Sequence, residues 1–138
     1  MRYFALDVGD RRIGLAVGDD AFGLSRALPT LRRSRRLEAD IERIASIARD
    51  EKVGGLVIGL PLTLRGESGA QAERVRRFAA ALGVTGMPVE LYDERNTTVE
   101  AIGRGAPDPD AGAARVLLED YLHTKRPATG DPDSTVTM

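Results

Sequence analysis

Hydrophobic and polar residues follow a strand-like pattern over the first part of the chain. Residues 2–8 form an apolar run that predicts a buried strand, a turn is expected at residues 9–10, and residues 12–18 predict the second arm of a hairpin. A third strand is expected near residues 25–31, where Pro29 indicates an edge position because proline cannot donate to a sheet ladder. The chain is therefore expected to begin with three antiparallel strands.

The middle of the chain alternates between helical and strand patterns. Apolar residues at helical spacing predict a helix over residues 37–50, and the continuous apolar run at 55–59 predicts a central parallel strand. Ser68, with Gln71 three residues later, fits a capping box at the start of a second helix. The expected core face of that helix consists of Ala72, Val75, Phe78, Ala79 and Leu82.

The last part of the chain predicts one more strand, over residues 89–92, and a short helix over 97–102. A final helix is expected from Asp110. Its apolar face consists of Ala114, Leu117, Leu118, Tyr121 and Leu122. Residues 124–138 are rich in Pro, Thr and Asp and are expected to form a disordered tail, so the folded domain is expected to span residues 1–123.

The predicted order of elements is β-β-β-α-β-α-β-α. Three antiparallel strands followed by strand–helix alternation imply an α/β domain in which a mixed five-stranded sheet carries helices on both faces. This is the order of the ribonuclease-H-like fold.

Composition is that of one ordinary globular domain. The 138 residues are 42% hydrophobic and 30% charged, which argues against disorder of the whole chain. Cysteine is absent, which excludes a disulfide framework and a thiolate metal site. No secretory signal is recognisable at the N-terminus, and no apolar stretch is long enough to span a bilayer. We therefore expect a cytoplasmic protein with no membrane partner.

The net charge is only −1, but the basic residues are unevenly distributed. Eighteen of the twenty are arginine, and they cluster at residues 11–12, 32–36 and 74–77. Arginine suits bidentate contacts to phosphate, which favours a nucleic-acid partner. The same clusters also fit solvated surfaces of a chain with an arginine-rich composition, and both interpretations stay open here.

Three acidic segments could meet at one edge of the sheet. Asp7 ends the first strand, and open α/β sheets bind ligands beyond the carboxyl ends of their strands. Asp93 and Glu94 end the last strand, and period-two alternation allows only one of them to face that edge. Asp110 could return to the same edge. Such oxygen ligands suit Mg²⁺ or Mn²⁺, and two ions roughly 4 Å apart can activate water for phosphodiester cleavage.

Each acid also has a purely structural interpretation. Asp7 could cap the turn at Gly9 through an Asx hydrogen bond, and Asp110 could be only a helix N-cap. Glu94 could pair with a neighbouring arginine at the surface. His123, near the end of the last helix, is expected to be an exposed cation and not a proton shuttle.

Four segments carry motifs that resemble those of one family. They are 5–19 (ALDVGDRRIGLAVGD), 57–62 with 66–69 (VIGLPL and GESG), 93–101 (DERNTTVEA) and the final helix from Asp110 to Leu122. Together they resemble, in order, the YqgF/RuvX family of bacterial ribonuclease-H-like proteins, known as Holliday junction resolvases or pre-16S rRNA nucleases. Each motif alone is weak, whereas four in register are a strong signal.

The resemblance implies a role for several residues. The catalytic and metal-binding acids would be Asp7, Glu94 and Asp110, holding Mg²⁺ or Mn²⁺. The substrate-binding residues would be Arg11, Arg12, Gly59, Pro61, Arg95, Thr97 and Thr98, and Gly66 would help to shape a close backbone approach. The sequence departs from the family pattern at Asn96 and Arg65. It also has an unusually short connection between Ala101 and Asp110, which affects the expected substrate affinity more than metal binding.

The activity that the resemblance implies is a metal-dependent endonuclease acting on structured RNA, at the 5′ end of pre-16S rRNA. One alternative is cleavage of four-way DNA junctions, which would need a two-fold dimer, and the sequence leaves monomer and homodimer open. Another is a non-catalytic nucleic-acid-binding or ribosome-associated factor. The hairpin at 7–17 also resembles the first phosphate loop of actin-like ATPases. Those proteins need two ribonuclease-H-like lobes to enclose a nucleotide, so an ATP-binding module is less favoured.

Overall fold

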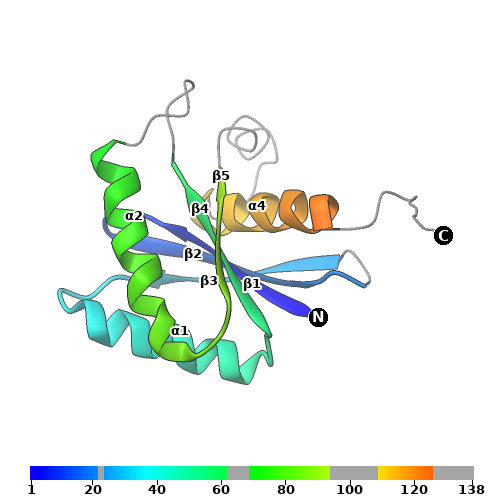
Figure 1. The fold of residues 1–138 in the computed structure, drawn as a ribbon, viewed down its shortest axis with the longest axis horizontal. Coiled ribbons are helices and arrows are strands. Elements are labelled where there is room, and N and C mark those ends of the chain that lie inside the picture. The colour runs from blue at the N-terminus through cyan, green and yellow to red at the C-terminus, as the bar shows by residue number, and fades with distance from the viewer. Residues whose placement is uncertain (22–23, 62–68, 94–108, 126–138) are drawn as a thin grey trace.

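The structure, a computed structural model, describes residues 1–21, 24–61, 69–93 and 109–125 (Figure 1). The strands are β1 (Arg2–Val8), β2 (Arg12–Asp19), β3 (Leu24–Arg32), β4 (Gly55–Leu60) and β5 (Val89–Asp93). The helices are α1 (Leu37–Asp50), α2 (Ala70–Ala81), the 3-10 helix η1 (Leu82–Thr85) and α4 (Pro109–Lys125). All five strands and α1 agree with the predicted bounds to within one residue at each end.

The five strands form one mixed sheet in the order β3-β2-β1-β4-β5. β1 is antiparallel to β2, and β2 is antiparallel to β3, whereas β4 lies parallel to both β1 and β5. β3, which contains Pro29, is at the edge of the sheet as predicted. The predicted sheet is therefore confirmed.

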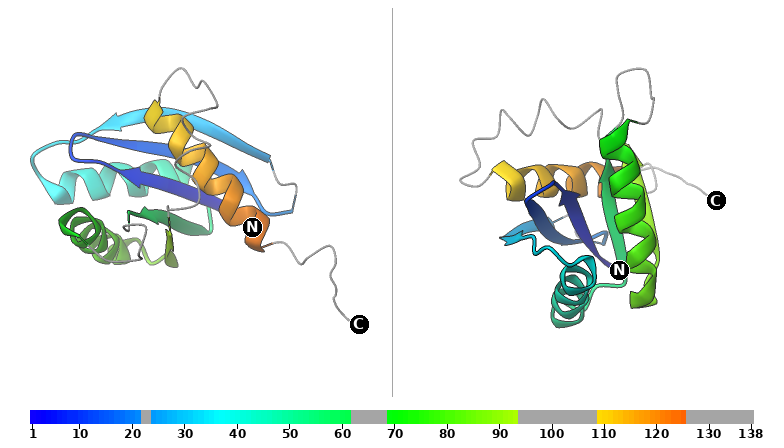
Figure 2. Two further views of the ribbon diagram at one scale, coloured as in Figure 1. Left: turned by 90° about the horizontal axis from the view of Figure 1, so that it is seen from above. Right: turned by 90° about the vertical axis from the view of Figure 1, so that its left-hand side faces the viewer.

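Helices cover both faces of the sheet, as predicted: α1 and α2 lie on one side and α4 lies on the other (Figure 2). Side chains of β1 alternate between the two cores. Phe4 and Leu6 pack into the core with α1 and α2, whereas Tyr3 and Ala5 pack with α4. Phe4 and Leu6 are fully buried, and burial of each contributes about 1.5–3 kcal/mol to folding. This alternation decides on which face each strand residue can act.

The start of α2 corrects one prediction. The N-cap of α2 is Gly69, with no side-chain cap, so the predicted capping box of Ser68 and Gln71 is wrong. The Gln71 amide Nε2 instead donates to the backbone carbonyl of Val8 at 3.3 Å. A contact to β1 thus replaces the local contact that the motif suggested. Leu82 is buried as expected, although it belongs to η1.

The last helix is longer than predicted. α4 begins at Pro109, where a proline fits the first helical turn because its missing N–H would have no partner there. It continues through Lys125, two residues beyond the predicted end of the domain, and the Thr124 hydroxyl donates to the Tyr121 carbonyl at 2.7 Å. His123 is exposed, as expected. The short helix predicted at 97–102 and the tail at 126–138 lie outside the described residues. None of the described helices is long and apolar enough to cross a membrane.

Candidate active site

The carboxyl ends of β1, β4 and β5 lie at one edge of the sheet, because these three strands are parallel. Asp7 is half-buried, one residue before the end of β1 at that edge. Its partner in β2 is Gly14. In β4, the register that pairs Leu6 with Ile58 brings Gly59 beside Asp7 one residue later. Both neighbouring strands therefore place a glycine next to the carboxylate, and neither adds a side chain there.

Asp7 lies on the face of the sheet that α4 covers. It shares the parity of Tyr3 and Ala5, which pack with Leu117, Leu118 and other apolar residues of α4. Asp110 belongs to the first turn of that same helix, although only its backbone is described. The sheet and the helix thus bring these two segments to a common face.

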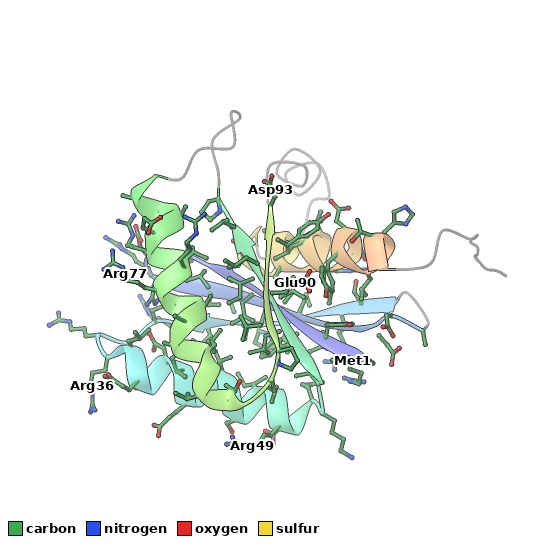
Figure 3. The ribbon with its side chains drawn as sticks, viewed as in Figure 1. Met1, Arg36, Arg49, Arg77, Glu90 and Asp93 are labelled. Atoms are coloured by element: carbon green, nitrogen blue, oxygen red, sulfur yellow. The ribbon has the colours of Figure 1, made fainter. Side chains whose placement is uncertain are left out.

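The alternation of β5 separates the two acids at its end. The Tyr121 hydroxyl of α4 donates to Glu90 at 2.9 Å, and the rings of Tyr92 and Tyr121 lie 5.9 Å apart, edge to face. Glu90 and Tyr92 therefore face α4, as Asp7 does. Asp93, at the tip of β5, has the opposite parity (Figure 3). Glu94 lies outside the described residues.

The tyrosines beside this face titrate at unusually high pH. Burial raises the pKa of Tyr121, and its hydrogen bond to Glu90 raises that pKa further. Burial also raises the pKa of Tyr92, with smaller contributions from the nearby charges of Asp120 and Asp93. Both phenols are therefore neutral hydrogen-bonding groups at ordinary pH.

The turn after Asp7 is braced from two other elements. The Gly9 N–H donates to the Arg12 carbonyl at 2.9 Å, so the backbone of the hairpin accepts the hydrogen bond of this amide. The Gly9 carbonyl accepts a hydrogen bond from the Arg33 guanidinium at 3.0 Å, and the Val8 carbonyl accepts the one from Gln71. The backbone of the two residues that follow Asp7 is thereby tied to the β3–α1 connection and to α2.

Arg33 is itself held by a buried acid. Asp40 of α1 is fully buried, and its carboxylate accepts the Ser34 amide at 2.9 Å and lies 3.4 Å from Arg33 Nε. The Arg33 guanidinium also stacks over the ring of Phe78, 5.2 Å from its centroid. Sequence reasoning missed this pair. The available signal was an aspartate four residues before Ile44, on the apolar face of the predicted helix.

Arg11 and Arg12, two of the expected substrate contacts, are exposed where the β1–β2 hairpin turns. With Thr30 and Arg32 they line a hollow of about 350 Å³. A polyanion that approached the carboxyl edge of β1 would therefore meet guanidinium groups at the hairpin turn that follows Asp7.

The structure places part of the predicted site. Five of the predicted residues are described in full: Asp7, Arg11, Arg12, Gly59 and Pro61. Others lie outside the described residues: Gly66, Glu94, Arg95, Thr97 and Thr98. Among the side chains that the structure describes, no three acidic or histidine groups come together to hold a metal ion. The convergence of Asp7, Glu94 and Asp110 stays a prediction.

The fold is the ribonuclease-H-like fold, shared with the Holliday junction resolvase RuvC. A solved structure titled "T. thermophilus RuvC in complex with Holliday junction substrate" superposes with a TM-score of 0.62 at 16% sequence identity. The match covers 91% of this chain and 95% of that one. At this level of identity the similarity concerns the fold alone.

The sequence comparison goes further. The chain belongs to the RuvX family, whose model, described as "Holliday junction resolvase", matches residues 1–124. A relative from Anaeromyxobacter sp. (strain Fw109-5) is 44% identical over 133 residues, covering 88% of this chain and 96% of the relative. Another, from Thermus thermophilus, is 44% identical over 132 residues, covering 88% and 97%. Both relatives carry the name "Putative pre-16S rRNA nuclease".

Proposed function

We propose that this chain is a divalent-metal-dependent endonuclease that cleaves structured RNA, with the 5′ end of the 16S rRNA precursor as its substrate. Membership of the RuvX family makes it a nuclease that hydrolyses phosphodiester bonds. The observation that carries the assignment of the site is the position of Asp7, between Gly14 and Gly59 on the face covered by α4. A cytoplasmic location, where such precursors are made, belongs to the same proposal.

Asp7, Glu94 and Asp110 are the proposed ligands of Mg²⁺ or Mn²⁺. Carboxylate oxygens are the donors that these ions prefer, and the two glycines beside Asp7 in the sheet add no side chain next to its carboxylate. When bound, such ions supply an activated water and stabilise the leaving oxygen. The opposite parity of Asp93 supports Glu94 as the second acid.

The remaining predicted residues would orient the substrate. Arg11 and Arg12, which line a hollow at the hairpin, would contact backbone phosphates, and the backbone at Gly59 and Pro61 would allow a close approach at the end of β4. We assign Arg95, Thr97 and Thr98 to contacts around the scissile phosphate on the family resemblance.

Asp7→Asn tests the proposal, because asparagine keeps the shape and removes the charge. Mn²⁺-dependent cleavage of a 16S rRNA precursor should fall by about a hundredfold or more, since even outer-shell partners of a metal are worth about 10–100-fold. Asp50→Asn is the matched control, an exposed aspartate at the end of α1 that should cleave like the wild type. Unchanged cleavage by Asp7→Asn would refute the nuclease site as proposed.

Adjacent acids at the end of β5 give a second comparison. Glu94→Gln should reproduce the loss seen with Asp7→Asn, whereas Asp93→Asn should retain most of the activity. The reverse result would identify Asp93, and not Glu94, as the second ligand and would leave the proposed role of Asp7 unchanged.

Cleavage of four-way DNA junctions is the second candidate, favoured by the description of the family model. A precursor RNA and a synthetic junction should be assayed side by side at one salt concentration, because phosphate binding depends strongly on salt. Preferential cleavage of the junction, abolished by Asp7→Asn, would support the proposed metal site and would show that the substrate is junction DNA and not precursor RNA.

A further inference from the structure

A second arginine-lined cleft lies on the α1 and α2 side of the molecule. Its volume is about 200 Å³. The residues that line it are Arg33, Leu37, Arg74, Arg77 and Phe78. Figure 3 shows Arg77 on α2 and Arg36 at the start of α1 on the same side of the molecule, with Arg49 at the far end of α1. Asp7 belongs to the opposite face of the sheet, so this cleft is separate from the proposed metal site.

The charge in this cleft is incompletely neutralised. Asp40 pairs with Arg33, and the exposed Asp10 lies 3.5 Å from Arg74. Arg77 and Arg36 are exposed, and neither forms an ion pair within the part of the chain that the structure describes. An anionic ligand would therefore find cationic groups that are not already committed to carboxylates.

The chemistry of the cleft favours phosphate over a nucleobase. Phe78 is 2% exposed and the Arg33 guanidinium covers its ring, so this aromatic face is not available for stacking a base. Guanidinium groups match the geometry of phosphate oxygens and read no base sequence there. The cleft is thus suited to the backbone of a nucleic acid.

The cleft is continuous with the hairpin that carries Asp7. The Arg33 amide donates to the Arg11 carbonyl at 2.8 Å, and its guanidinium donates to Gly9. Asp10, in the same turn, reaches Arg74 of α2. A strand whose scissile phosphate lay near Asp7 could pass Arg11 and Arg12 at the hairpin and reach Arg77 in the cleft, although the exposed carboxylate of Asp10 lies in the same turn.

We propose that this cleft, with Arg77 as its main cation and Arg36 at its rim, binds a backbone phosphate of the same nucleic-acid substrate away from the cleavage point. The inference rests on the proposed function. It adds a second contact region that extends the footprint of the enzyme from the α4 face around to the α1 and α2 side.

Binding can be measured without cleavage by using full-length chains that carry Asp7→Asn. The probe is a fluorescent hairpin RNA with single-stranded flanks, taken from a 16S rRNA precursor, titrated at several KCl concentrations. Arg77→Gln should weaken binding several-fold and lower the slope of log Kd against log salt by about one, the value expected for one lost phosphate contact. Arg77→Glu should weaken binding more, and Arg77→Lys should restore most of the slope.

Arg49→Gln is the control, since Arg49 is also exposed, on α1, but does not line the cleft. If Arg77→Gln and Arg77→Glu bind with the same Kd and salt slope as Arg49→Gln, the cleft does not contact the substrate and the inference is wrong. The proposed function fails on a different result, unchanged cleavage by Asp7→Asn, so the two failures are distinguishable. Thermal melting of each variant separates loss of binding from loss of fold.

Discussion

Asp40→Ala removes the buried carboxylate that holds Arg33 against the turn after Asp7. Asp40 is the one charged residue that is fully buried among the residues described, and it makes two contacts, to the Ser34 amide and to Arg33. In the variant the Ser34 amide loses its acceptor, and the Arg33 guanidinium keeps only the Gly9 carbonyl and the ring of Phe78.

The expected loss of stability in Asp40→Ala depends on how far water can replace the carboxylate as a partner of Arg33 and Ser34. Removing one partner of a buried ion pair costs about 3–5 kcal/mol when the other charge stays buried. The Arg33 side chain is 23% exposed, so water recovers part of that cost. A buried amide without an acceptor would add about 1–3 kcal/mol, but Ser34 is exposed and water can replace much of its lost hydrogen bond. We expect Asp40→Ala to lower the free energy of unfolding by about 3 kcal/mol, and Asp40→Asn by about half as much, because asparagine still offers an acceptor to Ser34.

Urea unfolding followed by far-UV circular dichroism measures the effect as a shift of the midpoint at constant slope. Asp50→Asn, on the same helix but exposed, should change stability by less than about 0.5 kcal/mol. At temperatures where Asp40→Asn remains folded, the loosened turn should raise the Mn²⁺ concentration needed for half-maximal cleavage. A loss below about 1 kcal/mol for Asp40→Ala would show that water fully replaces Asp40 as the partner of Arg33 and Ser34, and would refute the stabilisation assigned to this buried carboxylate.

Two further predictions concern the frame around the site. Tyr121→Phe should make the free energy of unfolding depend less on pH in the alkaline range. Because the pKa of Tyr121 is raised in the folded state, its hydroxyl stabilises the fold fully below the ordinary tyrosine pKa of about 10, and this stabilisation is lost as pH rises above that value. The free energy of unfolding, measured between about pH 8 and 11, should therefore fall less steeply in the variant than in the wild type. A slope equal to that of the wild type would contradict this role. Gly86→Ala should lower the free energy of unfolding by about 1–2 kcal/mol, because Gly86 has a φ of 77° just before β5. In the control Gly83→Ala the added Cβ meets no atom within 4 Å, so stability should be nearly unchanged. Equal stabilities of the two variants would rule out backbone strain at Gly86.

The strands could be predicted from the sequence because their signals are local. Period-two alternation and short apolar runs predicted all five strands to within one residue at each end. The start of α2 could not be predicted in this way, because Gln71 is engaged by Val8 of β1, which is distant in sequence. The same limit explains why Asp40 was missed. The position of Asp40 on the apolar helix face indicated burial, but its role could be assigned only once its partners Arg33 and Ser34 in the β3–α1 connection were known.

The distribution of ion pairs bears on the arginine clusters, for which the sequence left two interpretations open. A bias in composition would give arginines the same surroundings everywhere. At the amino-terminal end of β1, however, Arg2 and Arg26 share the carboxylate of Glu51. On the side of the carboxyl end, Arg36 and Arg77 form no ion pair with any described residue, whereas Arg74 pairs with Asp10. The described structure thus neutralises Arg2 and Arg26 on Glu51 and leaves Arg36 and Arg77 without an ion pair among the described residues, and these two available cations favour a polyanionic partner even at a net charge of −1.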